Sequence, residues 1–136
     1  MSVDLPDADG VFRGRAEWQD SLYWENAVIH ELGHVMDRAF GLTAAVRGEM
    51  DADFAELPEE LTRESLADGG VNKFFYFLQP KDGRLGERAR KELVAEAFDV
   101  LLRGEASSYN YRNLTERFPR TLAALRAALE IKLGPL

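Results

Sequence analysis

The stretch AVIHELGHVMD, residues 27–37, contains both histidines of the 136-residue chain, His30 and His34, with Glu31 between them. On an α-helix, at about 100° per residue, the two imidazoles lie about 40° apart on one side. The opposite arc is filled by apolar residues: Val28, Leu32, Val35, Met36 and Ala39. The pattern predicts an amphipathic helix over residues 21–40, with Gly41 as its C-terminal stop. This helix is expected to bury its apolar arc and to present the imidazoles on the other face.

Histidines on adjacent turns can direct two ring nitrogens at one metal ion, and Glu31 projects to the side, where it can act as a base on water. This spacing predicts a hydrolytic zinc site. The alternative is an ordinary amphipathic helix with two surface or partly buried histidines. Gly33 favours the site, because a glycine inside a helix costs roughly 1 kcal/mol relative to alanine. We therefore expect another group to approach the backbone there.

A third protein ligand would be a carboxylate, because the chain has no cysteine and no third histidine. The stretch KELVAEAFDVLL, residues 91–102, places Glu92 and Glu96 one turn apart on a helix expected over about 85–102. The buried arc expected for this helix is Leu93, Val94, Ala97, Phe98, Leu101 and Leu102. Helical periodicity does not decide which of the two glutamates would be the third metal ligand. The alternative to a metal ligand on this helix is an acidic face exposed to solvent.

The rest of the chain is expected to form further helices and few β-strands. Residues 1–20 are rich in turn formers, and a helix is expected over 58–66. The aromatic stretch VNKFFYFL, residues 71–78, indicates a strand or a partly buried segment. One or two helices are expected over 113–133, with Pro119 at a start or a kink. These patterns predict a predominantly helical α+β fold with a minimal sheet or short strands.

Composition limits the partners. A chain of 136 residues that is 46% apolar suits one domain over 1–136. The net charge of -7 disfavours nucleic acid and anionic membrane surfaces. We find no signal peptide and no transmembrane stretch, so a cytoplasmic location or export by a non-classical route is expected. A peptide or protein is the expected partner, and the sequence does not set the oligomeric state.

Three segments together resemble a known family. HELGHVMD, KELVAEAFDVLL and FPRTLAAL (residues 118–125) are similar to the catalytic domain of the anthrax lethal factor type, which includes the Pro-Pro endopeptidases and related toxin domains. These proteins are gluzincins, and the resemblance covers roughly residues 25–133. It implies a small zincin-like metalloprotease domain that binds zinc and hydrolyses peptide bonds.

The resemblance also assigns roles to residues. It implies that His30, His34 and Glu92 bind zinc and that Glu31 is the general base. Glu96 matches the second acid of the family pattern. Together with Asp37, we expect Glu96 to orient the imidazoles by accepting hydrogen bonds from their distal N–H groups.

The oxyanion-stabilising tyrosine of the family has no counterpart a few residues before the ligand glutamate, where this chain has Leu85. Tyr76 is the candidate for that catalytic role, with Tyr109 and Tyr111 as rivals. A core aromatic within KFFYF is the alternative reading of Tyr76.

Two alternatives to an enzyme stay open. One is a catalytically silent zincin-like domain that binds or regulates a peptide or protein through the same cleft. Glu31 argues against it, because a binding module needs no base beside its metal. The other is a helical interaction domain without metal.

Overall fold

The computed structural model describes residues 17–58, 85–107 and 110–136, and every element within these ranges is a helix. The elements are α1 (Glu17–Phe40), α2 (Leu42–Ala55), α4 (Glu87–Arg103), the short 3-10 helix η1 (Gly104–Ser107), α5 (Asn110–Arg117) and α6 (Pro119–Leu133). The predominantly helical fold is therefore confirmed, and the described residues contain no strand. The helix expected over 58–66 and the strand expected over 71–78 lie outside the described residues, apart from the exposed, non-helical Pro58.

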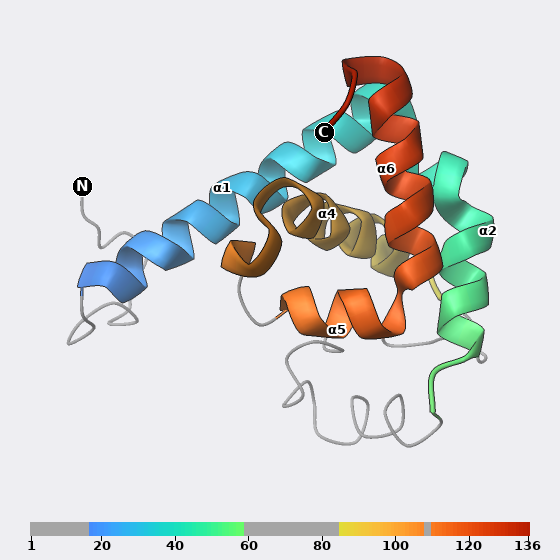
Figure 1. Ribbon diagram of the computed structural model, residues 1–136, viewed down its shortest axis with the longest axis horizontal. Helices are drawn as coiled ribbons and strands as arrows, with labels where there is room; N and C mark the ends of the chain where they lie inside the picture. The colour runs from blue at the N-terminus through green and yellow to red at the C-terminus, as the bar shows by residue number, and fades with distance from the viewer. Residues whose placement is uncertain (1–16, 59–84, 108–109) are drawn as a thin grey trace.

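Helix α4 lies at the centre of the arrangement, with the other helices around it (Figure 1). Helix α1 packs mainly on α4, whereas α2 packs mainly on α6. The central position follows from the composition of α4, which buries Ala89, Leu93, Val94, Ala95, Ala97, Phe98 and Val100. The apolar arc expected for this helix is thus largely confirmed, although Leu102 at its end is 50% exposed.

The buried face of α1 differs from the expected one, although Met36 of the expected arc does pack against the core. Val28, Leu32 and Val35 are 61%, 39% and 47% exposed, and Ala39 is exposed as well. The helix instead packs the side that carries His30 and Gly33 against α4. This side also carries the apolar Ile29 and Phe40, which pack against the core with Met36. Its imidazoles find hydrogen-bonding partners on α4 and so can be buried at low cost.

Gly33 explains how closely the two helices approach. A Cβ atom added at Gly33 would lie 2.9 Å from the Cα atom and 3.1 Å from the carbonyl oxygen of Ala95. Backbone therefore lies against backbone at this crossing, as the glycine predicted. The short separation brings side chains on either side of the crossing into reach of one another.

Helix α1 ends at Phe40 and is followed by Gly41, which adopts a left-handed conformation with φ +66°. Its N–H donates to the carbonyl oxygen of Asp37 over 2.7 Å, and this confirms the predicted stop. Helix α2 starts at the next residue and was not expected. Its buried residues Leu42, Val46 and Met50 recur every fourth position, a helical spacing that the sequence does contain.

Two buried aspartates fix the starts of later helices. Asp37 accepts hydrogen bonds from the backbone N–H (2.7 Å) and hydroxyl (2.5 Å) of Thr43 at the start of α2. Asp53 accepts the same two bonds from Thr121, both at 2.8 Å, at the start of α6. Pro119 occupies the first turn of α6, so the predicted start at this proline is confirmed. None of the described helices is long and apolar enough to cross a membrane.

Candidate metal centre

Three side chains from α1 and α4 bring their donor atoms together. His30 Nε2 lies 3.2 Å from His34 Nε2 and 2.8 Å from Glu92 Oε1. His34 Nε2 lies 3.2 Å from Glu92 Oε2. The histidines come from successive turns of α1, and Glu92 faces them from α4.

These separations suit a single tetrahedral ion. With metal–ligand bonds of about 2.0–2.1 Å, two tetrahedral ligand atoms on zinc are about 3.3 Å apart. Donor atoms of His30, His34 and Glu92 all lie within 4.8 Å of one another. Two histidines and one glutamate form a donor set of the catalytic zinc type, which leaves a fourth position open. The side chains are 17%, 17% and 23% exposed, so the cluster is partly accessible from solvent.

Glu96 holds His30 from the far side of the ring. His30 Nδ1 lies 2.7 Å from Glu96 Oε2. A proton on Nδ1 then donates to Glu96 and leaves the Nε2 lone pair for a metal ion, which is the arrangement that metal-binding histidines usually have. Glu96 therefore lies where a supporting acid is expected, and Glu92 lies where a ligand is expected.

The charges around His30 favour its protonated form in the absence of metal. Burial lowers the pKa of His30, but the hydrogen bond to Glu96 and the negative charges of Glu96 and Glu92 outweigh burial, so that the pKa is raised. Two carboxylates converge on a half-buried imidazole, and a cation is the species that relieves their repulsion. A proton on the ring and a metal ion at the donor cluster are two ways to supply it.

An ion-pair network continues from Glu96 along the same face of α4. Arg103 donates to both carboxylate oxygens of Asp99, at 2.6 and 3.0 Å, and its third nitrogen reaches Glu25 of α1 at 3.2 Å. Burial raises the pKa of Asp99, and Arg103 opposes this shift. The hydrogen bond to Asp99 raises the pKa of Arg103. Sequence reasoning gave these residues no part in the site, although their positions three and seven residues after Glu96 place them on its face.

Asp37 does not occupy the place expected of it. Its two carboxylate oxygens bond to Thr43, so the contacts described for Asp37 cap α2 and do not orient an imidazole. The physical reason is the one-residue break at Gly41, which folds the start of α2 back onto the carboxylate of Asp37.

Glu31 is exposed and stands outside the donor cluster. This carboxylate, next to His30 in sequence, is open to water. Tyr76 and Tyr109 lie outside the described residues. Tyr111 packs against the hydrophobic core from α5.

Comparisons of the chain with protein-family models, curated proteins and solved structures found no match. The likeness to the lethal factor type therefore depends on the three sequence segments alone. The geometry of His30, His34 and Glu92 is an independent observation, because it follows from how α1 and α4 pack.

Proposed function

We propose that this chain is a zincin-like, zinc-dependent endopeptidase. The observation that supports the proposal is the convergence of His30, His34 and Glu92 at separations of 2.8 to 3.2 Å, which suit tetrahedral zinc. Glu96, bonded to the far nitrogen of His30, adds the supporting carboxylate that such centres use.

Each residue has a chemical part in this proposal. His30 and His34, as neutral imidazoles, and Glu92 would hold the ion, and Glu96 would keep the His30 ring in its orientation. Zinc bound there would supply a Lewis acid that polarises a carbonyl and makes water nucleophilic near neutral pH.

Glu31 would carry the proton transfers. It takes a proton as water forms a bond to the scissile carbonyl carbon, and it returns that proton to the leaving nitrogen as the C–N bond breaks. Glu31 suits this part because it is exposed and follows His30 directly, yet does not itself belong to the donor cluster. No oxyanion-stabilising residue is assigned among the described residues.

Metal analysis followed by peptide digestion tests the proposal. We expect one zinc per chain by elemental analysis of purified protein, and cleavage of a peptide library that stops when a chelator is added and returns with zinc. Glu31→Gln should keep the zinc and lose the cleavage. Glu116→Gln is the matched control, because it removes an exposed carboxylate on α5 and should leave both unchanged.

The other outcomes identify the alternatives. Zinc at one per chain without cleavage of any peptide would contradict the enzyme and indicate a silent zincin-like binding domain. Failure to bind zinc at all would contradict both the enzyme and the silent zincin-like domain, and it would indicate a helical interaction domain without metal. Cleavage that survives in Glu31→Gln would assign the chemistry to other residues.

A further inference from the structure

A cleft of about 300 Å³ lies directly beside the donor cluster. His34 forms part of its wall, and the rest comes from the end of α1, the start of α2 and the start of α4. Its polar lining residues include Arg38, Thr43, Arg47, Glu87 and Lys91. This volume is at the lower end of the range for ligand sites, so it suits one or two side chains of a larger molecule better than a whole cofactor.

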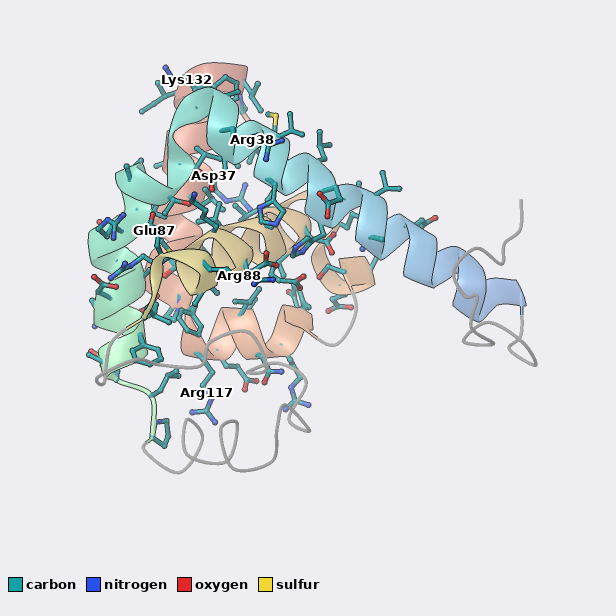
Figure 2. The ribbon with its side chains drawn as sticks, turned by 180° about the vertical axis from the view of Figure 1, so that it is seen from behind. Asp37, Arg38, Glu87, Arg88, Arg117 and Lys132 are labelled. Carbon is teal, nitrogen blue, oxygen red and sulfur yellow. The ribbon has the colours of Figure 1, made fainter. Side chains whose placement is uncertain are left out.

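The cleft has an excess of positive charge in a chain whose net charge is -7. Its lining includes three cations, Arg38, Arg47 and Lys91, and two carboxylates, Asp37 and Glu87. Figure 2 shows Asp37 between Arg38 of α1 and Glu87 at the start of α4. A basic cleft in an acidic protein selects for a ligand group of opposite charge.

The two carboxylates are already engaged. Arg47 donates to both oxygens of Glu87, at 2.8 and 3.0 Å, which neutralises that pair. The oxygens of Asp37 accept both bonds from Thr43. Among the described residues, neither Arg38 nor Lys91 has an ion pair within 4 Å, although the charge of Lys91 acts on Glu87 one turn earlier, and both side chains are exposed. Two cations are therefore available to a ligand.

Their positions relate the cleft to the donor cluster. Arg38 follows His34 by one turn of α1, and Lys91 precedes Glu92 on α4. One cation thus comes from each of the two helices that supply the candidate metal ligands. A residue of extended peptide spans about 3.3–3.6 Å, so a peptide at the cluster could place a nearby side chain or its own end in the cleft.

We propose that the cleft is a specificity subsite that binds a carboxylate of the peptide substrate through Arg38 and Lys91. The carboxylate can be the side chain of an aspartate or glutamate near the scissile bond, or the C-terminus of the peptide. The proposal rests on the proposed peptidase function, and it adds the substrate class: acidic peptides, or peptides cut near their C-terminal end.

Direct binding to a variant that lacks the base tests this. The probes are alanine- and serine-based decapeptides that carry a neutral fluorophore and a single glutamate at successive positions, each matched by a glutamine peptide, all with C-terminal amides. A second arm compares the glutamate-free peptide as free acid and as amide. Binding to zinc-loaded Glu31→Gln is measured by fluorescence anisotropy at low ionic strength.

We expect the carboxylate peptide of at least one matched pair to bind about three- to tenfold more tightly, as two partly exposed ion pairs allow. The arm in which this occurs distinguishes an acidic side chain from a C-terminus. The ratio should fall to about one in the variant that also carries Arg38→Gln and Lys91→Gln, and it should fall as salt is added. Arg112→Gln with Arg117→Gln removes the same charge from α5, where Arg117 lies far from Arg38 in Figure 2, and should keep the ratio.

Three results would overturn the subsite: no carboxylate preference in either arm, a preference that survives loss of Arg38 and Lys91, or one that the α5 control also removes. Each is a ratio between matched peptides, so a general loss of affinity does not imitate it, and circular dichroism of each variant checks that the protein is folded. The ratio is measured in a protein that lacks the base, so it is independent of hydrolysis. A wild-type protein that binds peptides but cleaves none would contradict the proposed function and leave the subsite standing.

Discussion

The backbone of Gly33 on α1 lies against the backbone of Ala95 on α4, so closely that a Cβ atom on the glycine would be 2.9 Å from the Cα atom of Ala95. His30 and His34 lie on either side of this contact in α1, and Glu92 and Glu96 on either side in α4. The spacing of the donor cluster thus depends on a glycine that binds nothing itself.

Replacing that glycine should loosen the centre. We expect Gly33→Ala to lower the free energy of unfolding by about 1–3 kcal/mol, as overpacking does, and to weaken zinc binding, because α1 must move away from α4. Gly48→Ala is the control, since Gly48 is exposed within α2 and a Cβ there meets nothing within 4 Å. It should raise stability by roughly 0.5–1 kcal/mol. Urea denaturation measures the free energy of unfolding of each variant, and a zinc titration measures its zinc affinity. A Gly33→Ala protein as stable as wild type would contradict the tight contact.

Zinc should stabilise the fold, because its ligands come from two helices that are held together only in the native state. At a free zinc concentration of about 100 times the dissociation constant, the gain in free energy of unfolding is about 2.7 kcal/mol. We expect the melting temperature to rise on addition of zinc and to fall on chelation. His34→Ala, which removes one donor, should show little response. An equal shift in wild type and His34→Ala would mean that zinc binds elsewhere.

Helix boundaries could be predicted where local signals are strong. The helices α1, α4 and α6 were expected, although α1 begins at Glu17, within the segment 1–20 that was expected to be loop-rich. Gly41 marks an end as predicted, and Pro119 marks a start, one of the two roles expected of it. Helix α2 was missed, although its buried residues recur every four positions. Its capping carboxylate, Asp37, lies before the break and within the preceding helix, so no local capping signal announces it.

The donor cluster of His30, His34 and Glu92 was predicted in its residues but not in its setting. The spacing of His30 and His34 indicated one shared ion, because it depends only on helical geometry within α1. The face that α1 buries was predicted wrongly apart from Met36, since it combines Ile29, Met36 and Phe40 with imidazoles that are buried against carboxylates from α4. Such pairing depends on the register between two helices, and here the contact of Gly33 with Ala95 sets that register.

Glu92 and Glu96 should differ as ligand and support. Glu92 contacts Nε2 of both histidines, whereas the described contact of Glu96 with the imidazoles is to Nδ1 of His30. We expect Glu92→Gln to abolish stoichiometric zinc, and Glu96→Gln to weaken zinc affinity by about 10- to 100-fold. Competition with a chromogenic chelator measures both affinities. Reversed effects in the two variants would exchange their roles and would mean that α4 is rotated about its axis relative to the structure described.

Asp37 should affect folding and not the metal. Its carboxylate is buried and accepts both hydrogen bonds from Thr43 at the start of α2. Asp37→Ala leaves the Thr43 N–H and hydroxyl without this partner, so we expect the free energy of unfolding to fall by about 1–3 kcal/mol. Zinc affinity of the folded variant should stay within a factor of about two, whereas a carboxylate that orients a ligand imidazole would lower it about 10- to 100-fold on removal. Denaturation and zinc titration of the same variant separate the two roles. A loss of zinc affinity without a loss of stability would restore the role that the sequence first indicated for Asp37.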